Sequence, residues 1–172
     1  MGAWMASGED ARPGRERVAA DAAARGLQVE FVERMRAGSL EEAATILGIA
    51  PADILKSLVV KRSDDTFLFA LVPGDRQISW PKLRAVVGVN KLQLPAPEVA
   101  LAATGYERGT ITPLGSTTAW PVFVDAAVVA SPGRRVSMGA GEHGCSLIVD
   151  ASELVAALDA TVADISEPQA AG

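Results

Sequence analysis

The sequence predicts a single mixed α/β domain over residues 13–165. Strand-like apolar runs alternate along the chain with short helical segments, which is typical of a mixed layer and not of a helical bundle or a β-sandwich. Two of these runs, residues 56–61 and 66–72, flank a short polar link, so we expect an antiparallel hairpin. A chain of 172 residues is also long enough to bury a core without disulfides or a metal.

The N-terminal part is expected to hold one helix and one strand. Residues 1–12 mix Gly, Ser, Ala and charged residues without periodicity, and we expect a disordered lead. An alanine-rich helix should follow from Pro13 to Arg25, because proline suits the first helical turn and Gly26 stops the helix. Residues 27–32 have the pattern of a first strand.

A capping box predicts the start of the next helix. The hydroxyl of Ser39 can accept a hydrogen bond from the backbone N–H three residues on, and Glu42 can reach back to the N–H of Ser39. Gly48 ends this helix, and a short helical turn over residues 49–55 leads into the hairpin. Both hairpin strands are apolar on both faces, so the hairpin should lie centrally in a sheet.

The second half of the chain continues the mixed pattern up to a tail, residues 166–172, that we expect to be disordered. The expected helices cover residues 80–87, 94–104 and 150–158, and the expected strands or extended segments cover residues 121–124, 135–138, 145–149 and 162–165.

Two glycine-rich loops lie in this half. Residues 104–115 read T-G-Y-E-R-G-T-I-T-P-L-G, and residues 139–144 read G-A-G-E-H-G. The first has too many special backbone positions for the interior of a helix or strand. It is either a binding surface or an ordinary surface excursion, and loop patterns alone leave both interpretations open. Backbone N–H groups in both loops could bind a carbonyl, carboxylate or phosphate group.

Composition excludes several classes of function. The net charge of −5 argues against broad affinity for nucleic acid, but it leaves room for a local basic patch in the middle third of the chain. No apolar run approaches the roughly 18 to 20 residues of a membrane span, and the N-terminus lacks a secretory signal, so we expect a cytoplasmic protein that does not bind a membrane. One cysteine and one histidine cannot form an internal disulfide or a three-histidine metal site.

Lys56 is the candidate catalytic side chain. It lies where a helical turn meets a strand that is apolar on both faces. Its ammonium either extends to the surface over an apolar stem or points into a cavity beside the glycine-rich loops. In the second case a partly desolvated ammonium could hold a carbonyl or carboxyl oxygen and stabilise developing negative charge.

Other catalytic patterns are weak. The chain has neither a phosphate-binding G-x-x-x-x-G-K-[ST] motif nor a G-x-S-x-G nucleophile elbow, and residues 139–144 lie between two strands instead of opening a helix. Cys145 and His143 could form a thiol nucleophile and its base, although a lone cysteine is more often part of a packed core.

The order of the motifs resembles a known family. I-L-K-S-L-V-V at residues 54–60 is followed by a second strand, the loop of residues 104–115, V-D at residues 124–125 and a glycine-rich turn that ends at Gly144. In this combination the sequence is similar to the YbaK/ProX (EbsC-like) aminoacyl-tRNA deacylases, relatives of the editing domain of bacterial prolyl-tRNA synthetase. The resemblance covers about residues 26–165.

This resemblance implies the YbaK-type fold, a curved, mostly antiparallel sheet with short flanking helices. It also implies a trans-editing hydrolase that cleaves the ester of mischarged aminoacyl-tRNA, of the Cys- or Ala-tRNA(Pro) type or with another small amino acid. The expected partners are the 3′ acceptor end of aminoacyl-tRNA and a synthetase such as prolyl-tRNA synthetase. No metal or organic cofactor is expected. The alternative is a catalytically weak module of the same fold that binds tRNA or a synthetase.

The resemblance also implies which residues form the site. Lys56 matches the lysine that binds and orients the aminoacyl group while water, or the thiol of a cysteinyl substrate, attacks the carbonyl carbon. The matching substrate-binding positions are Val32, Thr104, Gly105, Tyr106, Gly109, Thr110, Pro113, Gly115, Gly139, Gly141 and Gly144.

Two of these positions depart from the cysteine-specific members of the family. Those members carry an aromatic residue at the position of Val32 and a serine at the position of Gly139. Replacing a serine by glycine removes a hydroxyl and would enlarge the cavity. The amino acid therefore stays open among alanine, cysteine, serine and threonine.

Overall fold

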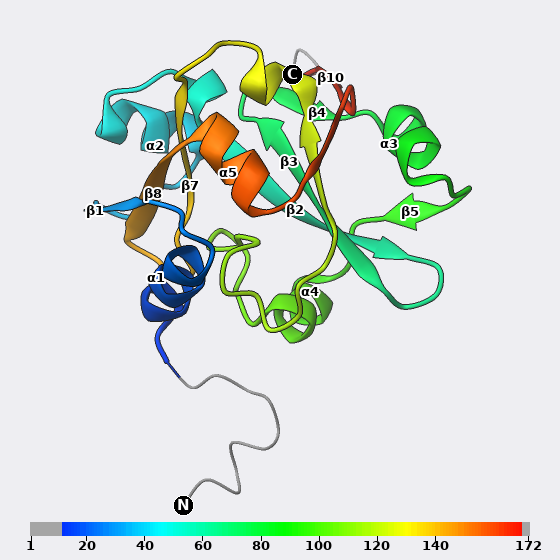
Figure 1. The fold of residues 1–172 in the computed structure, drawn as a ribbon, viewed down its shortest axis with the longest axis horizontal. Helices are drawn as coiled ribbons and strands as arrows, with labels where there is room; N and C mark the ends of the chain where they lie inside the picture. The colour runs from blue at the N-terminus through cyan, green and yellow to red at the C-terminus, as the bar shows by residue number, and fades with distance from the viewer. Residues whose placement is uncertain (1–11, 170–172) are drawn as a thin grey trace, which may run out of the picture.

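The computed structural model describes residues 12–169, which form short helices around three small sheets (Figure 1). The elements in chain order are α1 (Gly14–Ala24), β1 (Glu30–Glu33), α2 (Leu40–Leu47), the 3-10 turn η2 (Pro51–Asp53), β2 (Leu55–Arg62), β3 (Phe67–Pro73), β4 (Arg76–Ile78), α3 (Trp80–Val87), β5 (Leu92–Gln93), α4 (Pro97–Thr104), β6 (Val122–Asp125), the 3-10 turn η3 (Ala126–Val129), β7 (Arg135–Gly139), β8 (Cys145–Asp150), α5 (Ala151–Ala157), β9 (Thr161–Ala163) and β10 (Ser166–Pro168).

The largest sheet has five strands in the order β5-β2-β3-β6-β9. β2 and β3 form the predicted antiparallel hairpin, and β3 is buried along its whole length, so the expected central position is confirmed. β6 runs parallel to β3, and β9 runs parallel to β6. The sequence pattern did not predict these parallel pairs. A long connection separates β3 from β6, and local patterns do not indicate which distant strands become neighbours.

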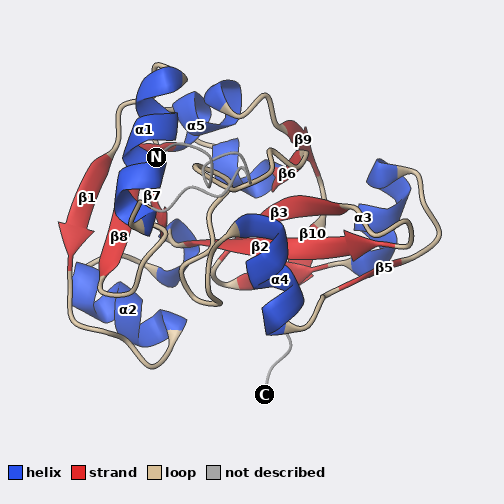
Figure 2. Cartoon of the chain, turned by 90° about the horizontal axis from the view of Figure 1, so that it is seen from below, coloured by secondary structure: helices blue, strands red, loops and turns tan. Residues whose placement is uncertain are grey.

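The second sheet has the order β1-β8-β7, and it stands beside the five-stranded sheet (Figure 2). β7 and β8 are antiparallel and flank the glycine-rich turn that was expected there. An isolated bridge between Ile54 and Ser137 links this sheet to the start of β2. The start of β2 is thereby held close to the glycine-rich turn.

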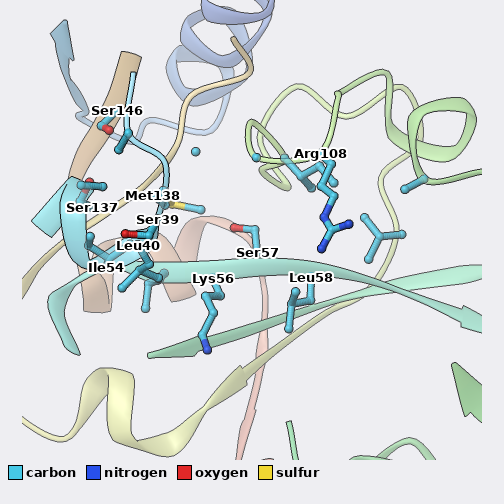
Figure 3. A pocket seen from close by; sticks show the side chains of 18 of the residues that line it. Ser39, Leu40, Ile54, Lys56, Ser57, Leu58, Arg108, Ser137, Met138 and Ser146 are labelled. Atoms are coloured by element: carbon cyan, nitrogen blue, oxygen red, sulfur yellow. The ribbon is translucent and has the colours of Figure 1, made fainter. Parts of the chain in front are cut away.

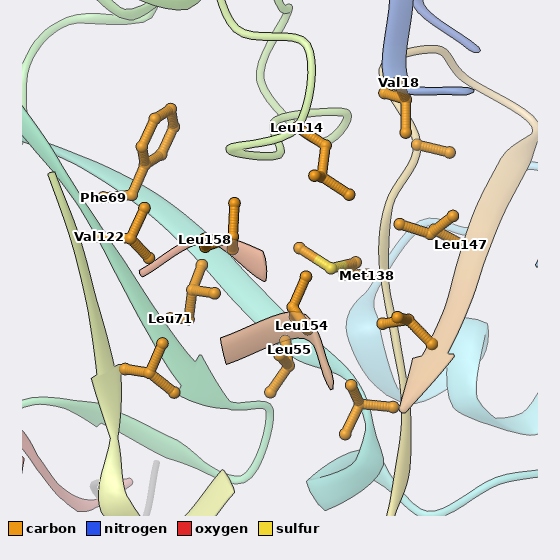
Figure 4. Packing of buried hydrophobic residues seen from close by; sticks show 14 of the residues in the cluster. Val18, Leu55, Phe69, Leu71, Leu114, Val122, Met138, Leu147, Leu154 and Leu158 are labelled. Carbon is orange, nitrogen blue, oxygen red and sulfur yellow. The ribbon is translucent and has the colours of Figure 1, made fainter. Parts of the chain in front are cut away.

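Two apolar clusters stabilise the arrangement, one on each face of the five-stranded sheet. The larger cluster joins Leu55, Phe69 and Leu71 to Leu147 of the second sheet and Leu154 of α5 (Figure 4). The smaller cluster lies on the opposite face under α3. Alternate residues of β2 therefore face different cores, because successive strand side chains point to opposite faces.

Several local expectations need correction. Ser166 is fully buried in β10, which pairs with β4, so the tail does not become disordered at residue 166. The N–H of Glu42 does donate to the Ser39 hydroxyl, at 3.1 Å, but the Glu42 carboxylate accepts from the N–H of Gly38 instead of Ser39. β1 starts at Glu30, three residues later than expected. Most of the expected disordered lead and residues 170–172 lie outside the described residues.

None of the helices in residues 12–169 is both long enough and apolar enough to cross a membrane.

Candidate functional site

A cavity of about 690 Å³ lies along β2, between α2, the β7–β8 turn and the loop that follows α4 (Figure 3). This volume is within the range of sites for small organic ligands. The wall is mostly apolar, with a few polar side chains. Its members include Arg34, Ser39, Leu40, Ile54, Lys56, Ser57, Arg108, Gly109, Ser137, Met138, Gly139 and Ser146.

Lys56 belongs to the wall of this cavity and is partly buried. It lies opposite Val72 in the hairpin, and strand alternation places its side chain and that of Ser57 on opposite faces of β2. Figure 3 shows the Lys56 amine on the side of β2 away from Arg108 and Ser57. The cavity thus brings Lys56 into the same site as Gly109 and Gly139 but does not direct its amine at the loop of residues 104–115.

Burial lowers the pKa of the Lys56 ammonium, while the nearby carboxylates of Glu41 and Asp75 oppose this shift. Desolvation disfavours the charged form, and a partly desolvated cation interacts strongly with any anionic or carbonyl oxygen that enters the site. These properties suit a side chain that binds a polarised acyl group.

Four serines belong to the cavity wall, namely Ser39, Ser57, Ser137 and Ser146. The Ser57 hydroxyl is buried and has no hydrogen-bond partner among residues 12–169, which is unusual for a buried polar atom. Ser146 accepts a hydrogen bond of 2.7 Å from Nε of Arg34. Ser57 belongs to the cavity wall and faces the side of Met138 (Figure 3).

The glycine-rich turn and the loop of residues 104–115 meet at Gly139. A Cβ placed on Gly139 would lie 2.5 Å from the carbonyl oxygen of Ile111 and 2.9 Å from that of Thr110. The N–H of Gly141 donates to the Thr110 carbonyl at 3.0 Å. The space beside Gly139 is therefore filled by backbone, and the idea that glycine here enlarges the cavity is wrong.

This packing gives a first prediction. Gly139→Ser should destabilise the protein by about 2 kcal/mol, because the added Cβ forces the neighbouring backbone apart. Gly139→Ala carries the same Cβ without the hydroxyl and should lose a similar amount in urea denaturation. A Gly139→Ser protein as stable as the wild type would show that the loop moves aside freely.

The base of the loop of residues 104–115 is a structural assembly and does not line the cavity. Thr104 accepts a hydrogen bond from the N–H of Tyr106, whose own hydroxyl donates to the Leu114 carbonyl at 2.7 Å. Arg17 donates to the carbonyl oxygens of Thr104, Gly105 and Gly115 and stacks on the Tyr106 ring at 4.4 Å. These contacts hold the base of the loop in place.

The remaining expected positions also lie outside the cavity wall. Thr110 and Pro113 are buried members of the loop, and the carbonyl of Gly144 accepts a hydrogen bond from the N–H of Arg34. Val32 lies opposite Ser146 in the pairing of β1 and β8, and Ser146 belongs to the cavity wall whereas Val32 does not. Gly141 packs against α1, where a Cβ would meet Gly14.

Sequence reasoning missed several wall residues, among them Ser57, Arg108, Ser137 and Ser146. Arg108 projects toward β2 from the loop (Figure 3) and forms no ion pair within the described part of the chain. Its position inside the loop motif was the one available signal. The serines on β7 and β8 carried no signal, since only folding brings these strands beside β2.

A thiol mechanism has no geometric support. Burial raises the pKa of the Cys145 thiol, which favours the unreactive protonated form. His143 instead contacts Glu107, with Nε2 and Oε2 3.0 Å apart. Residues 12–169 contain no cluster of three or more His, Cys, Asp or Glu side chains that could hold a metal ion.

Comparison with known proteins places these features in a family. The family described as the aminoacyl-tRNA editing domain matches residues 36–157. The chain is 33% identical over 122 residues to a proline–tRNA ligase of Heliobacterium modesticaldum, an alignment that covers 71% of this chain and 20% of the ligase. A proline–tRNA ligase of Thermosipho melanesiensis is 36% identical over 86 residues, which are 50% of this chain and 15% of the ligase. The chain thus spans about a fifth or less of these relatives.

Solved structures agree with the expected fold. The hypothetical protein APE2540 superposes with a TM-score of 0.81 at 26% identity, over 88% of this chain and 99% of that one. A proposed trans-editing enzyme for prolyl tRNA synthetase gives a TM-score of 0.81 at 28% identity, over 92% of this chain and 99% of that one. The mixed α/β fold and the resemblance are confirmed, and the chain belongs to the aminoacyl-tRNA editing domain family.

Proposed function

We propose that this chain is a trans-editing hydrolase that cleaves the ester between a wrongly attached small amino acid and the 3′ adenosine of tRNA. The observation that carries the proposal is the cavity along β2 in a chain of the editing family: a partly desolvated lysine and, on the opposite face of the same strand, a serine hydroxyl without a partner among the described residues both belong to its wall. Water attacks the acyl carbon, the bond to the ribose oxygen breaks, and that oxygen takes up a proton. The Lys56 ammonium binds and orients the acyl group.

The names of the relatives suggest the tRNA. Curated relatives are proline–tRNA ligases, so we propose tRNA(Pro) as the carrier of the wrong amino acid and a prolyl-tRNA synthetase as the enzyme that supplies it. The purified chain should deacylate at least one of alanyl-, cysteinyl-, seryl- and threonyl-tRNA(Pro) well above the spontaneous rate. Prolyl-tRNA(Pro) serves as the control that should persist.

One observation favours a second function. Because the Lys56 amine leaves β2 on the face opposite Ser57, the chain could bind charged tRNA without cleaving it. In that case no ester in the panel would be hydrolysed faster than in buffer, while the tRNA would still bind. This outcome would replace the hydrolase by a binding module.

Arg108 gives a prediction for tRNA binding. Its exposed guanidinium extends over the cavity, where it can contact a phosphate of the acceptor end. Arg108→Ala should raise KM about fivefold or more with little change in kcat, and the slope of log KM against log salt should fall by about 1. Arg135→Ala, an exposed arginine paired with Glu30 outside the cavity, is the matched control and should leave both unchanged. Equal effects of the two variants would contradict a specific phosphate contact.

A further inference from the structure

Within the described residues, no other strand covers most of the edge of β2 that faces the cavity. At one end Ile54 forms a bridge with Ser137, and at the other end Lys61 pairs with Gln93 of β5. Between these two contacts the cavity lies directly beside the strand. An open strand edge carries unpaired backbone donors and acceptors and can add a further strand.

The direction of these backbone groups follows from the hairpin. The N–H of Arg62 donates to the carbonyl of Thr66 at 2.8 Å, so the polar groups of Arg62 face β3. In an antiparallel pair the direction alternates from one residue to the next, which turns the N–H and C=O of Ser57 and Val59 toward the cavity. Lys61, two positions further, does pair outward with β5. No hydrogen bond from another described residue reaches the backbone of Ser57 or Val59.

The open stretch offers the outward-facing polar groups of Ser57 and Val59, and those of Ser57 alone match a single amino acid. An aminoacyl ester carries a donor on its α-nitrogen and an acceptor on its carbonyl, with the same spacing as the N–H and C=O of one strand residue. We propose that the aminoacyl group binds the edge of β2 as one antiparallel strand residue opposite Ser57. Its α-ammonium donates to the C=O of Ser57, and its ester carbonyl accepts from the Ser57 N–H. This inference rests on the proposed function and adds the binding mode.

The pairing fixes where the rest of the substrate lies. Residues directly opposite each other in a sheet point to the same face, so an L-amino acid places its side chain beside the Ser57 hydroxyl, which is buried and unpartnered. A small side chain with a hydroxyl group would satisfy that oxygen. The antiparallel direction sends the ester oxygen toward the position of Lys56 on the strand, and the Lys56 ammonium lies on the face of β2 opposite the Ser57 hydroxyl. A D-amino acid would instead direct its side chain to the face of Lys56 and Leu58.

Amide NMR tests the binding mode independently of catalysis. The probe is 3′-(L-serylamino)-3′-deoxyadenosine, whose amide bond replaces the ester and keeps both the α-ammonium and the carbonyl. We expect the largest shift within β2 at the Ser57 amide and much smaller shifts at Lys56, Leu58 and Val60, whose N–H groups bond to β3. A uniform change along β2, no change at Ser57 on binding, or a Ser57 shift caused only by a strand-forming peptide would overturn the proposal.

Kinetics separate this inference from the proposed function. L-Seryl-, D-seryl- and 3-hydroxypropionyl-tRNA(Pro) differ only in the α-carbon, and the last lacks the α-nitrogen. We expect the L-ester to be cleaved at least about tenfold faster than the other two, a difference of about 1.4 kcal/mol. Ser57→Pro, which removes the N–H, should lose at least tenfold more kcat/KM than Ser57→Ala or Val59→Pro. Equal cleavage of the three esters would reject the edge pairing yet keep the hydrolase, whereas cleavage of no aminoacyl-tRNA in the panel would reject the hydrolase.

Discussion

Lys56→Met should lower kcat/KM for deacylation by at least about 100-fold while the protein stays folded. An ammonium that stabilises charge on an acyl oxygen contributes mainly to the transition state, and losing one such group typically costs about two to three orders of magnitude. Methionine keeps the length and most of the apolar volume of the side chain. Single-turnover deacylation of charged tRNA measures the loss, and thermal melts of both proteins check the fold.

Two variants define what the lysine supplies. Lys56→Arg keeps a positive charge and should retain part of the activity, although its planar group places the charge differently. Lys61 lies on the same strand but outside the cavity, where it pairs with Asp65. The Lys61→Met protein should therefore cleave the ester at the wild-type rate. Full activity in Lys56→Met would mean that the amine, which leaves β2 opposite Ser57, does not reach the acyl group.

The lowered pKa of Lys56 makes one pH-dependent contribution to stability. Below that pKa the amine is charged in both the folded and the unfolded chain, and the folded chain bears the full cost of desolvation. As the pH rises from the lowered pKa toward the ordinary lysine value, the folded chain releases its proton first, so this cost disappears and stability rises. Lys56→Met should therefore be at least as stable as the wild type at pH 7, and any excess should shrink at alkaline pH. A methionine variant that melts well below the wild type would assign Lys56 a structural role.

The sequence predicted the parts of the fold that depend on neighbours along the chain. The capped start of α2 at Ser39, the β2–β3 hairpin and the helix that ends at Gly88 all follow from local patterns, and the structure confirms them. It did not predict the parallel pairing of β6 with β3, nor the strand that begins at Ser166. These features depend on long-range pairing, which a three-residue strand cannot encode by itself.

The same limit explains which site residues were found. Gly109 and Gly139 could be predicted as site residues because glycine-rich motifs mark special backbone positions in the sequence. Both residues line the cavity. The glycine-rich motif also contains residues that only hold the loop, such as Gly105 and Gly115, and a motif cannot distinguish the two roles. Ser137 enters the site only because the second sheet folds against β2.

Arg17 holds the loop that carries the cavity wall, and its loss should have the largest effect on stability. The side chain is only 7% exposed and has no carboxylate partner in the described part of the chain; its hydrogen bonds of 3.0 to 3.3 Å go to three loop carbonyls instead. The guanidinium also lies over the Tyr106 ring, where a cation is attracted to the aromatic face. The loop backbone therefore depends on a residue of α1 that is about 90 positions away in sequence.

Arg17→Met should cost about 3 kcal/mol in urea denaturation, because the carbonyl oxygens of Gly105 and Gly115 lose their partner while they remain partly buried. Arg25→Met is the matched control: Arg25 lies at the end of α1 and pairs with Asp21 at the surface, so its loss should cost about 1 kcal/mol or less. The Arg17 variant should also deacylate more slowly under conditions where it is still folded, since Arg108 and Gly109 lie on the loop that Arg17 fixes. If it lost stability but kept the full rate, the loop would hold its shape without α1 and the cavity wall would be self-supporting.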